Sequence, residues 1–250
     1  MVSVAEILFI TIVAFVPAIL YALWIRSTEI YQREPVLAML GVFIYGAIVS
    51  VGLAVFLESI VIDLFSVVLS AGALSLFAAI VVAPIVEELT KATGVFAARG
   101  RLDEIENGLV YGAAVGLGFA ASENVLYFMD ALNAGGDIFV FTVIARTLTS
   151  TMLHASASAI VGFGIAQAGA RTRWFGNPTS WLPYYIIAVI IHALFNLLAS
   201  VGDIYADETG LLSLVGLVAG FALVWGVVRF VRRKIRELDT GGQAGPPRFI

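Results

Sequence analysis

The chain has 250 residues, of which 60% are hydrophobic and 13% are charged, and its formal net charge is −4. A charged share this small excludes a disordered chain and argues strongly against a soluble domain. There is no cysteine, so disulfides, thiolate metal sites and cysteine nucleophiles are excluded. The composition predicts an all-α, polytopic transmembrane helical bundle, because apolar spans in lipid must satisfy their backbone hydrogen bonds internally.

Seven apolar segments that are candidate membrane spans follow one another along the chain. They run roughly over 3–25, 36–57, 65–99, 107–129, 137–168, 180–201 and 210–230. The first segment has no basic amino-terminal region and is too long for the core of a signal peptide, so we do not expect it to be cleaved. The third and fifth exceed the roughly 20 residues that cross a bilayer, so we expect tilts or breaks there, with a kink at Pro84.

The connections between these segments alternate in charge. One set, together with the carboxy-terminal segment, holds Arg26, Arg33, Arg99, Arg101, Arg171, Arg173, Arg232, Arg233, Lys234 and Arg236. The alternate connections, at 58–63, 130–137 and 202–208, hold no basic residue. The positive-inside rule then predicts an outside N-terminus and a cytoplasmic C-terminus in the plasma membrane. We expect one transmembrane domain over 1–237 and a disordered cytoplasmic tail over 238–250.

Two adjacent acids lie deep in the third segment, where almost nothing else is polar. These are Glu87 and Glu88, and Lys91 follows four and three residues later on the same helix face. A carboxylate on a membrane helix costs roughly 2.5–3.5 kcal/mol on insertion scales, so two adjacent carboxylates indicate a specific role. The alternative is a helix end that has already emerged into the cytoplasm, but the return to apolar residues after Lys91 argues against it.

The fourth segment carries a third acid, Glu123, followed by Asn124. Three glycines that recur every four residues precede it: Gly108, Gly112 and Gly116. This is the small-residue pattern of close helix packing. Glu123 returns to the glycine face, and Tyr127 lies one turn further on, within hydrogen-bonding reach of it. A lone membrane acid usually faces the bundle interior, and a purely structural role for Glu123 remains the alternative.

Both histidines of the chain also lie inside predicted spans. A polar stripe on the fifth segment, widened by Arg146 and Ser150, consists of Thr147, Thr151, His154 and Ser158. On the sixth segment, His192 and Asn196 are four residues apart and share a face. Hydroxyl groups and a lone histidine are often structural, but three acids and two histidines in one bundle predict a single shared functional site.

These residue types supply what water attack on a peptide carbonyl requires. Desolvation disfavours the charged form of a glutamate and prepares it for general-base work. Histidine is the natural proton partner, and the pair of His192 and Asn196 can donate to a developing oxyanion. Lys91 allows the two adjacent carboxylates to differ in role, one held ionised and one able to accept a proton. The sequence does not distinguish which of them is the base.

Four blocks that occur in this order resemble the PrsW family of intramembrane proteases, which is grouped with CAAX-prenyl proteases and bacteriocin-processing relatives. They are Glu-Glu-Leu-Thr-Lys at 87–91, Tyr-Gly-Ala-Ala-Val-Gly-Leu-Gly-Phe-Ala-Ala-Ser-Glu-Asn at 111–124, the helix with His154, and His192-Ala-Leu-Phe-Asn196. The resemblance covers about residues 80–200. Each block alone is weak, whereas the ordered combination is specific.

The resemblance implies a glutamate-dependent endopeptidase whose site lies in the membrane. Its catalytic set would be Glu87, Glu88, Glu123, His154, His192 and Asn196, supported by Lys91, Asn124 and Tyr127. One of the paired glutamates would activate water. Glu123, with Phe119, matches a motif in which CAAX-type relatives carry histidine, so the proton-shuttle assignment stays open. One solution is that His154 is the shuttle and Glu123 orients it.

The resemblance also implies partners, because family members process membrane-anchored anti-sigma factors in stress signalling. We expect a membrane-anchored protein substrate, the lipid bilayer, no nucleic acid and no cofactor. Zinc is the alternative, since two histidines and three glutamates are possible ligands, although no His-Glu-x-x-His pair is present. Two other functions remain: a Glu/His proton relay or transporter, for which no internal repeat is found, and a non-catalytic adaptor with polar packing contacts.

Overall fold

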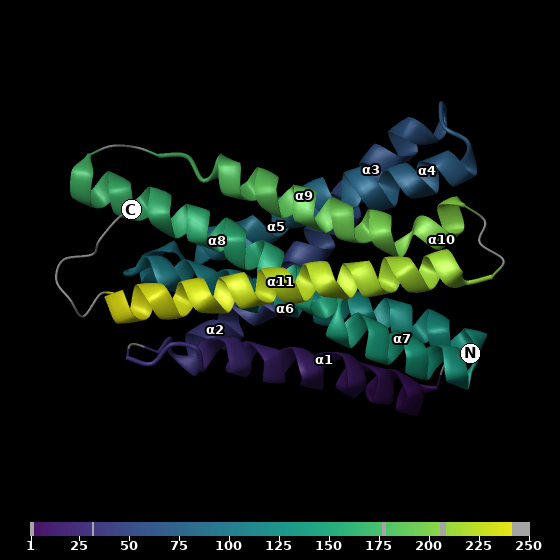
Figure 1. Ribbon diagram of the computed structural model, residues 1–250, viewed down its shortest axis with the longest axis horizontal. Helices are drawn as coiled ribbons and strands as arrows, with labels where there is room; N and C mark the ends of the chain where they lie inside the picture. The colour runs from purple at the N-terminus through teal and green to yellow at the C-terminus, as the bar shows by residue number, and fades with distance from the viewer. Residues whose placement is uncertain (1–2, 32, 177–178, 206–208, 242–250) are drawn as a thin grey trace.

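Figure 1 shows a computed structural model of the protein, in which long helices run roughly along one direction. The structure describes residues 3–31, 33–176, 179–205 and 209–241. The helices are α1 (Val4–Arg26), α2 (Val36–Ile44), η1 (Tyr45–Ser50), α3 (Val51–Ser66), α4 (Ala71–Phe77), η2 (Ala78–Val82), α5 (Ala83–Ala97), η3 (Arg99–Arg101), α6 (Ile105–Ala134), α7 (Gly136–Leu148), α8 (Ser150–Phe175), α9 (Leu182–Ala199), α10 (Val201–Ile204) and α11 (Leu211–Gly241). Seven helical stretches of this described part are long and apolar enough to cross a membrane, which confirms the predicted number of spans.

Three of these spans are built from more than one helix. Val36–Ser66 joins α2 to α3 through the π-helical turn η1, and Ala71–Ala97 joins α4 to α5 through a second π-helical turn, η2. The second span therefore continues past its predicted end at residue 57, so Glu58 lies within α3 and not in a connection. The fifth span breaks at Thr149, whose φ of −120° and ψ of −78° separate α7 from α8. Both of the spans expected to be irregular are thus broken.

The break predicted at Pro84 takes the form of the π-helical turn that precedes this proline. The Ala83 N–H bonds to the Ala78 carbonyl, and Pro84 has no N–H, so the Ala79 carbonyl lacks a donor within its own helix. Asn196 of α9 supplies one, because its Nδ2 donates to Ala79 O at 2.7 Å. A side chain from a neighbouring helix thus satisfies a carbonyl that a membrane span cannot leave unpaired.

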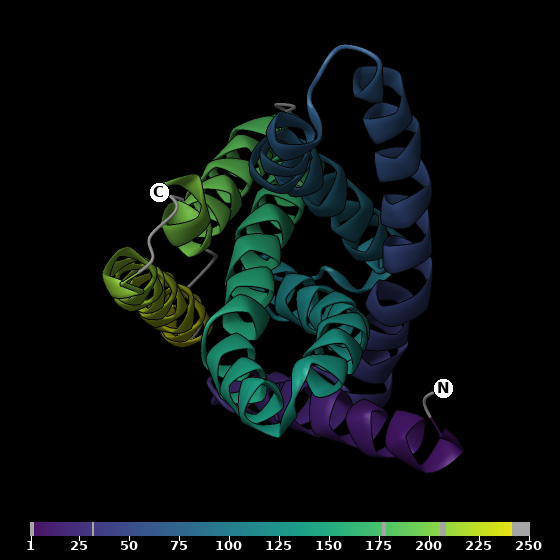
Figure 2. The same cartoon turned by 90° about the vertical axis from the view of Figure 1, so that its right-hand side faces the viewer.

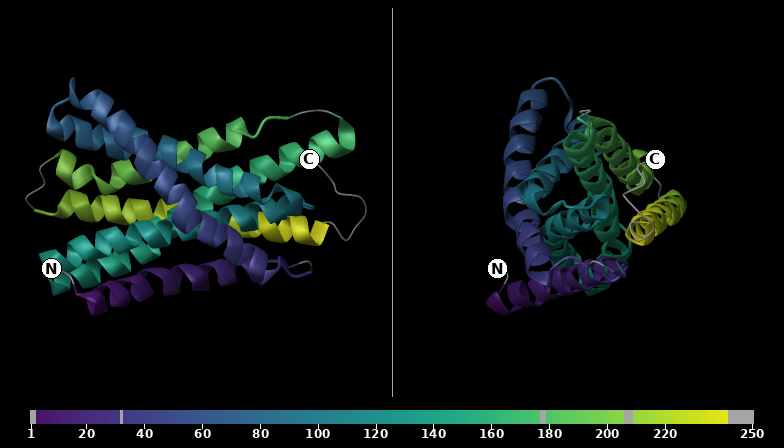
Figure 3. Two further views of the ribbon diagram at one scale, coloured as in Figure 1. Left: turned by 180° about the vertical axis from the view of Figure 1, so that it is seen from behind. Right: turned by 90° about the vertical axis from the view of Figure 1, so that its left-hand side faces the viewer.

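α6 forms the centre of the bundle. In its apolar stretch 78% of the residues are buried, against at most 44% in the other spans found among the described residues. Figure 2 shows α1, α3 and α11 at the periphery, and the left view of Figure 3 shows α3 crossing the bundle obliquely. A Cβ added at Gly108, Gly112 or Gly116 would collide with the carbonyl oxygen of Gly162, Ser158 or His154, respectively. The glycines therefore permit close packing of α6 on α8, as the sequence predicts.

The last helix extends further than the sequence suggests. α11 continues to Gly241, so the predicted disordered tail is wrong for residues 238–241, and the rest of that tail lies outside the described residues. The carboxylate of Asp239 explains the extension, since it accepts hydrogen bonds from the backbone N–H groups of Ile30 (2.6 Å) and Tyr31 (3.3 Å). These bonds tie the end of α11 to the connection between α1 and α2.

Basic connections meet at this same end of the bundle. Arg232 of α11 donates through Nε to Thr28 Oγ1 at 2.9 Å, next to the end of α1. Arg33 and Arg101, from two different connections, line one cleft of about 910 Å³. The spans therefore place charges that are far apart in the sequence together, as one membrane face requires. Which side of the membrane this end faces stays a prediction.

Candidate active site

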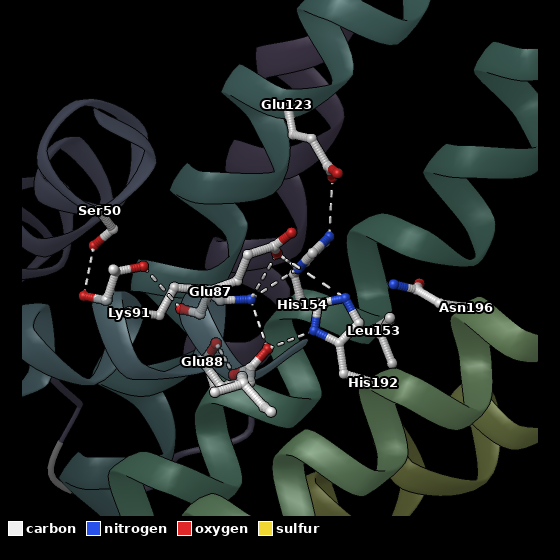
Figure 4. A network of polar contacts seen from close by, with 12 residues as sticks. Ser50, Glu87, Glu88, Lys91, Glu123, Leu153, His154, His192 and Asn196 are labelled. Carbon is white, nitrogen blue, oxygen red and sulfur yellow. Dashed lines mark hydrogen bonds and ion pairs between the residues drawn. The ribbon is translucent and has the colours of Figure 1, made fainter. Parts of the chain in front are cut away.

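Six ionisable side chains from four helices meet inside the bundle (Figure 4). α5 contributes Glu87, Glu88 and Lys91, α6 contributes Glu123, α8 contributes His154 and α9 contributes His192. All except Glu123 are almost completely buried. The structure thus brings together five of the six side chains that the sequence indicates as catalytic, whereas their catalytic role stays a prediction.

Lys91 lies at the centre of this network. Its Nζ is 2.6 Å from Glu88 Oε1, 3.5 Å from Glu87 Oε2 and 2.9 Å from His154 Nδ1. The ring of Phe119 lies 4.6 Å from the same nitrogen. A buried ammonium is expensive unless it is paired, so the two carboxylates one helical turn earlier compensate the charge that α5 buries.

Glu88 is fully enclosed and accepts hydrogen bonds with both of its oxygens. Oε1 accepts from Lys91 and from His192 Nδ1, the latter at 3.0 Å, and Oε2 accepts from Ser158 Oγ at 3.1 Å. Three donors from three helices favour the ionised form of this carboxyl group. Glu88 is therefore suited to orient Lys91 and His192 and not to bind a reacting water.

Glu87 is held much more loosely than its neighbour. Its Oε2 is 3.5 Å from Lys91 Nζ, 3.6 Å from His154 Nδ1 and 4.0 Å from His192 Nε2. Its side chain is 8% exposed, whereas that of Glu88 is 0% exposed. Separations above 3.5 Å between polar groups suit a bridging water. Of the two adjacent acids, Glu87 is the one that can act on a water molecule.

Glu123 pairs with one of the histidines. Its Oε2 lies 3.0 Å from His154 Nε2 and 2.7 Å from an Nη2 nitrogen of Arg146. Because the Lys91 ammonium can only donate to His154 Nδ1, a neutral His154 carries its proton on Nε2 and donates it to Glu123. Glu123 thus orients His154, and the residual charge of the carboxylate is balanced by Arg146.

Arg146 is a residue of this site whose importance the sequence does not reveal. Its Nε donates to Asn124 Oδ1 at 2.7 Å, and Asn124 donates in turn to Thr151 Oγ1 at 2.9 Å. Its guanidinium lies over the ring of Tyr127, 3.6 Å from the centroid. Tyr127 therefore supports the cation that pairs with Glu123, in place of the hydrogen bond expected between the tyrosine and the acid.

The two imidazoles pack edge to face against each other beside Glu87. Their ring centroids are 4.9 Å apart and the rings are nearly perpendicular, at 89°. His192 donates from Nδ1 to Glu88, so its Nε2 is left as an acceptor directed toward Glu87. Each histidine thus has one nitrogen on an orienting carboxylate and the other toward the same glutamate oxygen.

Asn196 does not join this network. Figure 4 shows its amide beyond His192, and the Nδ2 is committed to the Ala79 carbonyl that the π-helical turn leaves without a donor. Asn196 therefore has a structural contact with the broken helix, and the role expected for it, donation to an oxyanion together with His192, stays a prediction. Spacing on one helix correctly places the two residues on one face, but it does not show which neighbouring group each one meets.

The fold and the site define an integral, multi-pass membrane protein that encloses a carboxylate, imidazole and ammonium network within its spans. The model of a family described as PrsW family intramembrane metalloprotease matches residues 34–227. The chain therefore belongs to the PrsW family, and it is an intramembrane protease. No solved structure matches the chain.

Three similar proteins each carry the name Protease PrsW. The one from Clostridioides difficile (strain 630) is 29% identical over 189 residues, which cover 74% of this chain and 75% of the relative. The one from Geobacillus kaustophilus (strain HTA426) is 32% identical over 134 residues, covering 52% and 51% of the two chains. The one from Bacillus subtilis (strain 168) is 36% identical over 77 residues, covering 29% and 32%.

The family description implies a metal, and one set of side chains here fits such an ion. Glu87, His154 and His192 each offer a ligand atom, and these atoms all lie within 4.8 Å of one another. Two imidazoles and one carboxylate form a known catalytic zinc set, and metal-binding histidines usually donate their other ring nitrogen to a carboxylate, as both do here. Lys91 opposes metal binding, because its ammonium contacts the same nitrogen of His154 that faces Glu87. A bound divalent cation would supply Lewis-acid polarisation of a carbonyl and acidify water there.

Proposed function

We propose that this protease hydrolyses peptide bonds of membrane-associated proteins with a water molecule that Glu87 activates. One observation carries the proposal. Among the three acids of the network, Glu87 alone has no donor closer than 3.5 Å among the described residues, and a ring nitrogen of each histidine lies within 4.0 Å of its Oε2. A desolvated carboxylate with an adjacent imidazole is the arrangement required of a general base with a proton partner.

The proposed reaction follows from these positions. Glu87 accepts a proton as the water oxygen forms a bond to the substrate carbonyl carbon, and the negative charge that develops on the carbonyl oxygen lies near the Lys91 ammonium. Glu87 then passes this proton to the free Nε2 of His192, and Glu88 stabilises the transient imidazolium through its bond to Nδ1. The imidazolium gives the proton from Nε2 to the leaving nitrogen as the carbon–nitrogen bond breaks.

We further propose where this reaction takes place and on what. The protein would lie in the plasma membrane with its C-terminus in the cytoplasm, which the gathering of Arg33, Arg101 and Arg232 at one end of the bundle supports. Its substrate would be a membrane-anchored regulator of the anti-sigma-factor kind. The family resemblance supports this substrate class.

Labelling of new amino termini tests the proposal even though the natural substrate is unidentified. Membranes are prepared from source cells that carry either the wild-type protein, E87Q or the control E237Q, whose glutamate is 53% exposed on α11. New termini within or beside membrane segments should appear with the wild type and with E237Q, and should be absent with E87Q. The same termini in all three samples would contradict the proposal.

Metal-dependent hydrolysis is a second candidate, favoured by the convergence of Glu87, His154 and His192 within 4.8 Å. Exhaustive chelation of the purified protein, followed by elemental analysis and an activity measurement, separates the two candidates. The metal-free mechanism predicts full activity at a metal content near zero. Loss of activity that zinc restores, together with one bound ion per chain that is lost in H154A, would support the metal instead.

A further inference from the structure

A fourth acid, Glu58 of α3, lies beside the active site. Because α3 continues to Ser66, Glu58 is ~12 Å along the helix axis from that end, at about 1.5 Å per residue, and it lies within the span. Its Oε1 atom is buried and has no hydrogen-bond partner among the described residues. An unpaired carboxyl oxygen inside a membrane protein is expensive, and the described residues supply no partner for this one.

The face of α3 that carries Glu58 is the face that packs against the site. Ala54, one turn earlier, is buried in a cluster with Val86 of α5 and Phe119 of α6. The ring of Phe119 is in turn 4.6 Å from Lys91 Nζ. Since residues four apart share a helix face, Glu58 points to the same side as Ala54. Its charge also interacts with those of Glu123 and Lys91.

The most exposed side chains of the network lie at the edge that holds Glu123. The side chains of Glu123 and Arg146 are 21% and 17% exposed, whereas those of Lys91, His154 and His192 are at most 2% exposed. The charge of Glu58 interacts with that of Glu123 at this edge, so a substrate segment that enters there would pass close to Glu58. To be cut, that segment must unwind, and its backbone N–H groups then lose their helical partners in a place where lipid offers none.

We infer that Glu58 is a substrate-binding residue whose buried oxygen accepts a hydrogen bond from a backbone N–H of the unwound substrate segment. The inference rests on the proposed function and adds a subsite to it. Pairing the two groups satisfies both the acceptor that α3 buries and the donor that the substrate exposes on unwinding. Recognition of this kind does not depend on the side chains of the substrate.

The test uses a quenched-fluorescent peptide with one apolar span and a central Gly-Gly pair, in liposomes, selected because the wild type cleaves it and E87Q does not. Loss of one hydrogen bond to substrate predicts that E58L raises KM by about tenfold and leaves kcat within about twofold. E58Q keeps an acceptor oxygen, so its KM should stay near that of the wild type. D63L removes an exposed acid from the same helix and serves as the matched control.

Thermal unfolding in detergent separates substrate binding from a structural role. Because Glu58 Oε1 has no hydrogen-bond partner in the part of the chain that the structure describes, E58L should unfold at the wild-type temperature or above it. A lower unfolding temperature of E58L, an unchanged KM, or a KM for E58Q as high as that of E58L would each overturn the inference. Peptide cleavage by E87Q at the wild-type rate, or no cleavage of any such peptide by the wild type, would instead refute the proposed function.

Discussion

At the scale of single residues, two adjacent glutamates differ because their surroundings differ. Glu88 accepts from a lysine, a histidine and a serine, whereas Glu87 has its nearest donor at 3.5 Å. The sequence shows that both glutamates lie on the helix face of Lys91, but it does not show that the Nδ1–H group of His192 points to Glu88. That direction depends on the packing of α9 against α5, which spacing along one chain segment does not determine.

Substitutions of the two glutamates should therefore affect different properties. Loss of Glu88 should reduce the stability of the protein, and loss of Glu87 should reduce its activity. E88Q leaves the buried Lys91 ammonium without its closest counter-charge, so we expect a loss of about 3–5 kcal/mol in unfolding free energy. E87Q should unfold within about 1 kcal/mol of the wild type, because the loose contacts of Glu87 contribute little. The cleavage rate of E87Q should fall at least about 10³-fold, because Glu87 is the proposed base. Equilibrium unfolding in mixed micelles and single-turnover cleavage measure both quantities, and equal stability loss in the two variants would contradict this division.

At the scale of helices, the positions of breaks and close contacts place the site. The glycines of α6 were recognisable from their spacing, and the structure confirms their packing against α8. The hydrogen bond from Asn196 to the Ala79 carbonyl could not be recognised from the sequence. This carbonyl becomes unpaired only because a π-helical turn precedes Pro84. Glu58 was missed for a related reason: a charge at the end of an apolar run resembles the end of a span, although α3 continues for another two turns.

Close packing at Gly116 should be needed for both folding and catalysis. A methyl group added there would collide with the His154 carbonyl, so G116A should cost about 1–3 kcal/mol in stability and displace the histidine. A methyl group added at Gly52 of α3 would meet no atom within 4 Å, which makes G52A the matched control. The unfolding temperature and the cleavage rate should both fall in G116A and remain unchanged in G52A. A fully stable and active G116A would contradict the packing described here.

At the scale of the whole molecule, the end of the bundle where the basic connections meet also holds buried acids. Glu29 is fully buried, and its Oε2 accepts from the Glu34 backbone N–H at 2.9 Å. Burial raises the pKa of Glu29 from 4.5 to about 7, and the charges of Glu34 and Asp239 add to this effect while Arg26 opposes it. The pattern of basic connections predicted which loops meet here, but it did not predict an acid that is buried among them.

This acid should make stability depend on pH. The folded protein holds the Glu29 proton more tightly than the unfolded chain, so its stabilising contribution is complete below pH 4.5 and is lost as pH rises through about 7. E29Q, which cannot ionise, should therefore lose less stability than the wild type between pH 5 and pH 8. Unfolding temperatures in detergent across this range give the comparison. Parallel profiles of the two proteins would show that Glu29 does not titrate as described.

Peptide-bond hydrolysis by the purified protein in liposomes is the decisive measurement for a protease whose base is Glu87. A single-span peptide is incubated with the wild type or with E87Q in water enriched in ¹⁸O, and the masses of the fragments are measured by mass spectrometry. We predict cleavage inside the apolar span, one ¹⁸O atom in the new carboxyl group, and no product with E87Q. Undiminished cleavage by E87Q would contradict this mechanism, as would proton flux through the wild-type protein with no cleavage of any membrane-spanning peptide.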